Sequence, residues 1–171
     1  MNYGFIGAGN MAGAIIKGMT VGTGSFEGKD IFVYDLNASA AKSLADICKV
    51  NVCSSAEDVI ASSDVIVLAV KPNVLPDVVT QLKNKIIEKS PLVISIAAGK
   101  TLEFLEGLIA KDFPIVRVMP NINAKVGCAT SAFCTTETVS DEQKAIVKKL
   151  FSTVGAVTEL SEKMFSVHSV I

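Results

Sequence analysis

Short apolar runs alternate along the chain with longer segments in which apolar residues recur at every third or fourth position. An apolar run bounded by turn residues predicts a strand, and a period near 3.6 residues predicts a helix. The predicted strands are residues 3–6, 31–34, 50–53, 65–70, 92–96 and 115–118. The predicted helices are residues 10–21 and 38–48, a short helix from Ser54 or Ser55, a helix after Pro72 that ends near residue 87, and residues 101–110.

The pattern changes after Pro120. We expect a strand over 127–135, an amphipathic helix over 141–151 and a closing strand over 155–160, and we expect this unit to extend the sheet. Because strands alternate with helices, right-handed βαβ crossovers follow. The predicted fold is α/β: a Rossmann-like, doubly wound, mostly parallel sheet with helices on both faces and a C-terminal strand–helix–strand extension. Residues 1–160 are expected to form this domain.

A glycine-rich turn, residues 7–12 with the sequence GAGNMA, follows the first predicted strand and opens the first predicted helix. It has the G-x-G-x-x-A spacing of a dinucleotide-binding turn. Gly7 permits a tight turn, Gly9 lets a pyrophosphate approach the backbone, and Ala12 lets the helix pack closely on the strand. The exposed N–H groups at the helix start attract the phosphate charge. The turn therefore predicts a dinucleotide site.

Asp35 stands at the end of the second predicted strand, where this fold places the adenosine ribose. A carboxylate there accepts hydrogen bonds from the ribose hydroxyls and repels a 2′-phosphate, which favours NADH over NADPH. Residues 36–39 include no Arg that would hold a 2′-phosphate, although Asn37 and Ser39 are able to contact one. Both cofactors stay open, with NADH preferred. The alternative for Asp35 is a polar turn residue without a ligand.

Three later strands end in unusual turns that share one rim of the predicted sheet. Open α/β sheets bind ligands at the carboxyl ends of their strands. The runs are residues 69–73 (AVKPN), 95–99 (SIAAG) and 117–121 (RVMPN). The small residues of the second run leave room for a ring near the backbone. Each run alone is typical of an ordinary turn, and their coincidence at one rim indicates a site.

The composition excludes several classes of function. Of the 171 residues, 50% are apolar and 19% charged, which is typical of a globular domain. The net charge is −1 and no basic cluster occurs, so we expect no nucleic-acid partner. The longest apolar run, residues 65–70, is far shorter than the roughly 20 residues that span a bilayer, so no membrane partner is expected.

The cysteines and the N-terminus suggest a reducing compartment. The four cysteines form no C-x-x-C pair, and His168 is the only histidine, so no metal site is expected. We interpret the cysteines as reduced thiols. The chain begins almost directly with a strand and shows no signal-like leader, from which we expect a cytoplasmic protein.

The glycine turn and the three rim runs, taken in this order and spacing, resemble the N-terminal domain of the pyrroline-5-carboxylate reductases, which complete proline synthesis. The resemblance implies that the glycine turn holds the pyrophosphate, that residues 69–72 line the nicotinamide side with Ala97 and Ala98 beneath it, and that Asn121 lies beside nicotinamide and substrate. The implied cofactor-binding residues are Ile6, Gly7, Ala8, Gly9, Asn10, Met11, Asp35, Ala69, Val70, Lys71, Pro72, Ile96, Ala97, Ala98 and Asn121.

The resemblance implies two substrate-binding residues, Asn121 and Glu162, and no protein side chain as the catalytic acid. The alternative for Glu162 is a surface position at a helix start. The implied reaction is hydride transfer from NADPH or NADH to the C=N bond of a cyclic imine acid. Some positions depart from the family: Ile122-Asn123 replaces Thr-Pro, residues 127–129 replace Gly-Glu-Gly, and Ser166 replaces an acidic residue.

Family members continue through a hinge into a helical dimerisation domain. We therefore expect residues 161–171 to begin a helix that leads to that missing domain, the full-length protein to be a homodimer or a higher oligomer, and this chain to be a monomer. Two other functions stay open: a Rossmann dehydrogenase of the hydroxyacid type, and a dinucleotide-binding module without activity of its own.

Overall fold

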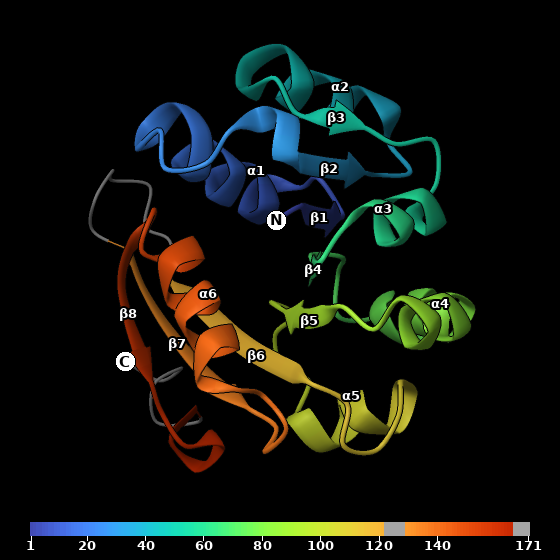
Figure 1. The fold of residues 1–171 in the computed structure, drawn as a ribbon, viewed down its shortest axis with the longest axis vertical. Coiled ribbons are helices and arrows are strands. Elements are labelled where there is room, and N and C mark those ends of the chain that lie inside the picture. The colour runs from blue at the N-terminus through green and yellow to red at the C-terminus, as the bar shows by residue number, and fades with distance from the viewer. Residues whose placement is uncertain (122–128, 166–171) are drawn as a thin grey trace.

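A single eight-stranded sheet with helices against both faces organises the computed structural model, which describes residues 1–121 and 129–165 (Figure 1). The strands are β1 (Tyr3–Ile6), β2 (Ile31–Tyr34), β3 (Asn51–Val52), β4 (Val65–Leu68), β5 (Leu92–Ser95), β6 (Ile115–Asn121), β7 (Ala129–Thr135) and β8 (Gly155–Glu159). The α-helices are α1 (Asn10–Lys17), α2 (Ala38–Cys48), α3 (Ala56–Ser62), α4 (Leu75–Lys89), α5 (Leu102–Leu108) and α6 (Asp141–Phe151).

The strand order is β3-β2-β1-β4-β5-β6-β7-β8. The first six strands in this order run parallel, β7 runs antiparallel to β6, and β8 runs parallel to β7. The chain thus starts in the middle of the sheet and turns back at β1, which is the doubly wound arrangement. The predicted fold class is confirmed, including the extension of the sheet by the last two strands.

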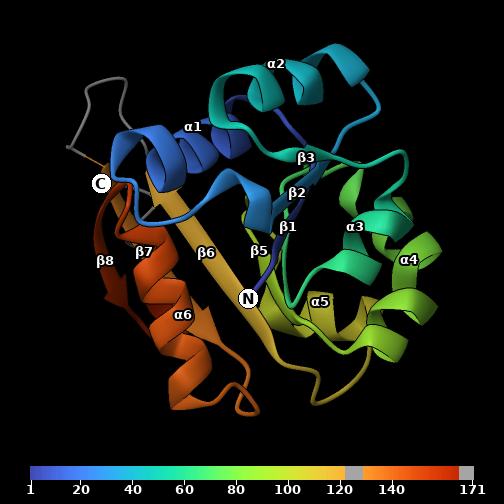
Figure 2. The same ribbon diagram turned by 45° about the horizontal axis from the view of Figure 1, so that its top comes forward.

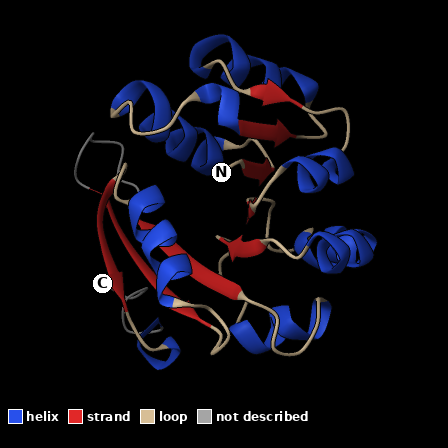
Figure 3. Ribbon diagram, in the orientation of Figure 1, coloured by secondary structure: helices blue, strands red, loops and turns tan. Residues whose placement is uncertain are grey.

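Apolar side chains bury both faces of the central strands. Phe5 of β1 and Val67 of β4 belong to one buried cluster with residues of α1, α2 and α6, whereas Ile6 and Leu68 belong to a second with residues of α3, α4 and α5. These two groups of helices cover opposite faces of the sheet (Figures 2 and 3). Burial on both faces explains why these strands read as unbroken apolar runs rather than alternating ones. Each such side chain that is fully buried contributes about 1.5–3 kcal/mol relative to an exposed one.

Polar side chains cap most of the helices. Asn37, Ser55 and Thr101 accept hydrogen bonds from the first turns of α2, α3 and α5, and Ser140 forms a reciprocal capping box with Gln143 at α6. Such a cap contributes about 1 kcal/mol by satisfying an otherwise unpaired N–H group. No side chain caps α1 or α4, whose N-cap residues are Gly9 and Val74.

Some predicted boundaries differ from the structure. The predicted helix 10–21 consists of α1 followed by a π-helical turn, Gly18–Gly22. Strand β6 continues to Asn121, beyond the predicted end at residue 118, because β7 pairs with it as far as Asn121. The helix predicted after Pro72 to end near residue 87 is α4, which starts at Leu75 and ends at Lys89. The amides of Val74 and Leu75 donate to the Lys71 carbonyl and close a turn before it.

The last described segment contains a 3₁₀ turn, Glu162–Met164, and ends at Phe165. The rest of the helix expected over 161–171 lies outside the described residues, as do Ile122, Asn123, Cys128 and Ser166. Within the described ranges, no helix has the length and apolar character to cross a membrane.

Candidate functional site

Gly7 makes a turn between the ends of β2 and β4 that a larger residue would not fit. Its φ is +109°, and a Cβ atom on it would lie 2.5 Å from the carbonyl oxygen of Ala69. The Gly7 amide donates to the Tyr34 carbonyl at 2.8 Å, and the Ala69 amide donates to the Ile6 carbonyl at 2.8 Å. The turn is therefore fixed by backbone on both sides, and glycine is required there by conformation and by space.

Gly9 has the opposite surroundings. A Cβ atom built on it would find no atom within 4 Å, apart from its own chain neighbours. Gly9 is exposed and is the N-cap residue of α1, whose first turn, with Asn10 and Met11, receives no side-chain cap. Unpaired N–H groups at a helix N-terminus attract an anion. The open space and the uncapped helix fit the pyrophosphate of a dinucleotide.

Asp35 lies against the same glycine turn. Its Oδ2 accepts a hydrogen bond from the Ala8 amide at 2.6 Å, and its Oδ1 accepts one from the Asn37 amide at 2.7 Å. The structure therefore brings together the two features that the sequence singled out separately. Each carboxylate oxygen can accept more than one hydrogen bond, so capacity remains for ribose hydroxyls.

A cavity of about 330 Å³ opens beside Asp35, between the ends of β1 and β2 and the helices α3 and α4. Three of the predicted site residues line it: Ile6, Gly7 and Val70. The sequence reasoning missed Leu36 and Val74, which also line it. Leu36 is 89% exposed and Val74 is 37% exposed, so both side chains are accessible at the opening of the cavity. Apolar side chains at the opening of a cavity suit a flat aromatic ring such as adenine.

The signal that could have found Leu36 is its position directly after Asp35. An apolar residue in a turn of otherwise polar character, at the rim where this fold binds ligands, indicates contact with a ligand rather than with the core. No comparable signal marks Val74, because its exposure depends on where α4 starts.

The three rim runs lie on neighbouring strands, as the sequence predicted. Leu68 of β4 pairs with Ser95 of β5, which in turn pairs with Arg117 of β6. The Ile96 amide donates to the Leu68 carbonyl at 3.2 Å, so the second run starts against the end of the first. Most of the other site candidates are accessible at this rim: Lys71, Ala98 and Asn121 are exposed, and Ala69, Val70, Pro72 and Ile96 are half-buried. Ala97 is buried.

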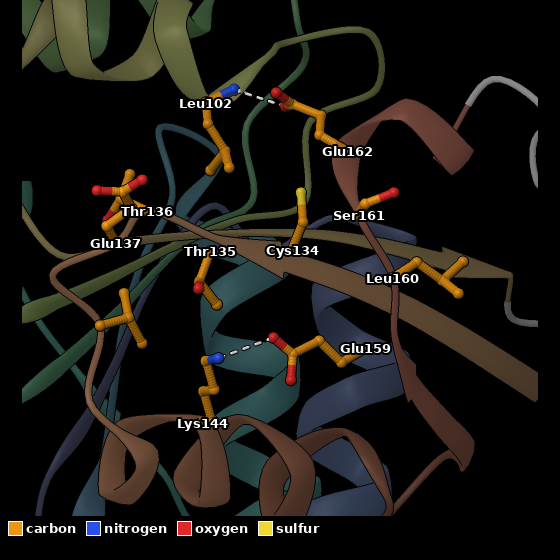
Figure 4. Close-up of a pocket in the computed structure, with 11 residues that line it drawn as sticks. Leu102, Cys134, Thr135, Thr136, Glu137, Lys144, Glu159, Leu160, Ser161 and Glu162 are labelled. Atoms are coloured by element: carbon orange, nitrogen blue, oxygen red, sulfur yellow. Dashed lines mark hydrogen bonds and ion pairs between the residues drawn. The ribbon is translucent and has the colours of Figure 1, made fainter.

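Glu162 is held away from the glycine turn, by β6 and α5. Its Oε2 accepts a hydrogen bond from the Leu102 amide at 2.8 Å (Figure 4). The same oxygen lies 3.0 Å from Nη1 of Arg117. Glu162 lines a second cavity, of about 430 Å³, with the ion pair of Lys144 and Glu159 on another wall. The sequence reasoning did not predict Arg117 as its partner.

The Cys134 thiol faces the same cavity (Figure 4). Its pKa is raised to about 12, chiefly by burial and then by the nearby carboxylates of Glu162 and Glu159, whereas Arg117 acts in the opposite direction. The side chain therefore stays a neutral thiol near pH 7 and is not a nucleophile. Residues 1–121 and 129–165 contain no group of three or more His, Cys, Asp or Glu that could hold a metal ion, and His168 lies outside them.

The glycine turn, the carboxylate bonded to it and the uncapped helix define a Rossmann-type dinucleotide-binding domain of the kind found in oxidoreductases. Residues 2–99 match the family described as "NADP oxidoreductase coenzyme F420-dependent". The chain belongs to this family.

Named relatives confirm the resemblance to pyrroline-5-carboxylate reductases. The chain is 38% identical to that enzyme from Arabidopsis thaliana over 95% of its own length and 58% of the relative's. A solved pyrroline-5-carboxylate reductase from Coxiella burnetii has a TM-score of 0.93 and 30% identity, covering 99% of this chain and 63% of that one. The Plasmodium falciparum pyrroline carboxylate reductase with NADP bound has a TM-score of 0.86 and 28% identity. The match covers 100% of this chain and 62% of that one. The chain thus spans about three fifths of these proteins.

Proposed function

We propose that the chain is the cofactor-binding part of a pyrroline-5-carboxylate reductase, which reduces 1-pyrroline-5-carboxylate to proline with NAD(P)H. The observation that carries the proposal is the 38% identity to such an enzyme over 95% of this chain. The same similarity disfavours a hydroxyacid dehydrogenase.

The described residues fit a bound dinucleotide in three places. The N–H groups of Asn10 and Met11 would hold the pyrophosphate next to the open side of Gly9. Asp35 would hold the adenosine ribose, with the adenine in the cavity beside Leu36. Residues 69–72 and 96–98 would flank the nicotinamide, with Asn121 at its substrate side. When bound, the cofactor supplies the hydride.

The proposed reaction depends mainly on how the protein orients the imine and the nicotinamide. Hydride adds to the imine carbon while the electron pair of the C=N bond moves onto the nitrogen, which carries a proton in the reactive form. Because a protonated imine is already electrophilic, no strong protein acid is needed. The protein's part is to hold the imine carbon at the nicotinamide face, which lowers the barrier through proximity.

Turnover tests the function. The purified chain is mixed with 1-pyrroline-5-carboxylate and NADH or NADPH; loss of nicotinamide absorbance and formation of proline are followed, with the full-length Arabidopsis enzyme as the positive control. Proline formation by the chain supports the proposal. Saturable NAD(P)H binding also supports it if proline is formed once the part of the Arabidopsis enzyme that this chain does not match is fused to the chain. Binding of neither cofactor, or oxidation of a 2-hydroxy acid in its place, would overturn it.

We propose further that NADH is preferred, because Asp35 places a negative charge where a 2′-phosphate would lie. In the Asp35→Asn variant, the ratio of the NADPH and NADH dissociation constants should fall at least about fivefold, since removing one close like charge relieves roughly 1 kcal/mol or more. Nicotinamide fluorescence titrations measure both constants. Asp46→Asn, which removes an exposed carboxylate from α2, should leave the ratio unchanged.

An equal ratio in Asp35→Asn and in the original chain would contradict this role. The hydrogen bonds of Asp35 to Ala8 and Asn37 mean that the variant also weakens the glycine turn. Such weakening lowers the affinity for both cofactors together. The ratio therefore isolates the effect of the charge on the 2′-phosphate.

We also propose that this chain alone is a monomer. Light scattering, which gives the molar mass in solution, measures this.

A further inference from the structure

A buried arginine organises the region between β6 and the last described segment. Arg117 is only 8% exposed, and its Nη1 lies 3.0 Å from the Glu162 carboxylate. Its guanidinium also stacks over the Phe165 ring, 4.7 Å from the ring centre. Two side chains from the segment after β8 thus contact the one cationic side chain, which projects from β6. We call Arg117 and Glu162 the Arg117–Glu162 pair.

The pair also reaches the start of α5. The oxygen of Glu162 that meets Arg117 accepts the 2.8 Å hydrogen bond from the Leu102 amide (Figure 4). Leu102 is the first residue of α5 and closes the loop 96–101. Two hydrogen bonds hold the opposite end of this loop. The Ile96 amide donates to the Leu68 carbonyl, and the Ala97 amide donates to the Ser95 hydroxyl.

The loop between these two anchors carries residues that the proposed function places at the nicotinamide. Ala98 and Gly99 are exposed, and Gly99 has a φ of +74° with no atom within 4 Å of a Cβ position. The middle of the loop therefore has little packing of its own, and its shape depends on its ends. The strand register places Arg117 directly beside Ser95, where the loop leaves β5.

We infer that Glu162 is a positioning residue: through Arg117 and Leu102 it fixes the loop 96–101 and ties the segment after β8 to the cofactor rim. It is not a ligand of the substrate. The inference rests on the proposed function, because the nicotinamide at this loop is part of that proposal. A buried Arg that loses its partner is left uncompensated, so the pair acts as one unit.

The test compares Glu162→Gln with Glu159→Gln. The control lies three residues away and breaks the ion pair of Glu159 with Lys144; the Glu159 side chain is 38% exposed. For each variant, the dissociation constants of NADH and of ADP are measured, and amide hydrogen exchange is measured at Leu102. ADP probes the adenosine half alone, whereas NADH also reports on the nicotinamide half.

In Glu162→Gln we expect Leu102 to exchange at least about tenfold faster and NADH to bind about tenfold more weakly, as the loss of a hydrogen bond to a charged group implies, with ADP affinity unchanged. Glu159→Gln should change none of the three. Glu162→Asp keeps the negative charge on a shorter side chain and replaces Glu162→Gln in the test if that variant does not fold. It should change Leu102 exchange and NADH affinity in the same directions by smaller factors.

Unchanged NADH affinity and unchanged Leu102 exchange would overturn the inference. That result would favour the substrate-binding role that the sequence predicted for Glu162. Equal loss of NADH and ADP affinity would also overturn it, because that result indicates general destabilisation. If the original chain binds neither NADH nor ADP, the proposed function fails, while Leu102 exchange still decides whether Glu162 holds α5.

Discussion

Replacing Gly9 with alanine should abolish dinucleotide binding while the protein stays as stable as before. The backbone of Gly9 has a φ of −75°, which alanine adopts without strain, and no atom lies within 4 Å of the added methyl group. Alanine restricts the unfolded chain more than glycine does, but it is a poorer N-cap residue, and each effect is worth roughly 0.5 kcal/mol. The two effects oppose each other, so the free energy of unfolding should change little. The methyl group would fill the space that we assign to the pyrophosphate.

Fluorescence titration with NADH and urea denaturation measure the two effects. We expect the dissociation constant of Gly9→Ala to rise at least about a hundredfold, equivalent to about 3 kcal/mol. Gly107→Ala is the matched control, since Gly107 is an exposed glycine of α5 that also has no neighbour within 4 Å. It should gain stability and bind NADH unchanged. Normal NADH binding by Gly9→Ala would refute the pyrophosphate site.

Gly7→Ala should have the reverse effect and lower the free energy of unfolding by about 4 kcal/mol. The expected loss has two sources: a φ of +109° that alanine rarely adopts, and a methyl group 2.5 Å from the Ala69 oxygen and 2.7 Å from its carbon. Both neighbours are backbone atoms, so no side chain can move aside. A loss of this size is a large part of the stability of a typical domain.

Gly99→Ala separates these two sources. Gly99 also has a positive φ, +74°, but nothing lies within 4 Å of its Cβ position, so alanine there adds strain without a clash. We expect a loss of about 1–2 kcal/mol from strain alone. Urea denaturation of both variants gives the comparison. A loss in Gly7→Ala no larger than that in Gly99→Ala would show that the contact with Ala69 does not matter.

The parts of the fold that local sequence determines were predictable. The four-residue strands β1 and β2 and the helices α2 and α6 have the predicted bounds. Their limits are set by nearby residues, such as the Asn37 and Ser140 caps. The end of β6 was predicted wrongly, because Pro120 suggested a stop whereas the pairing partner, β7, lies beyond it in the sequence.

The same distinction holds for the site. The meeting of the three rim runs was predictable, because the carboxyl ends of parallel strands share one edge. The contact of Asp35 with Ala8 spans 27 residues, and that of Arg117 with Glu162 spans 45, so no local pattern reveals either partner. The exposure of Leu36 depends on the tertiary fold in the same way.

The position of β1 has a consequence for synthesis on the ribosome. Of the eight strands of this sheet β1 is made first, yet it lies between β2 and β4. The Gly7 turn contacts Ala69, so it cannot close until Ala69 has emerged. After that point β5 and β6 add to one edge in the order in which they are made. The nascent chain can therefore complete the glycine turn early, and the remaining strands extend a sheet that is already formed.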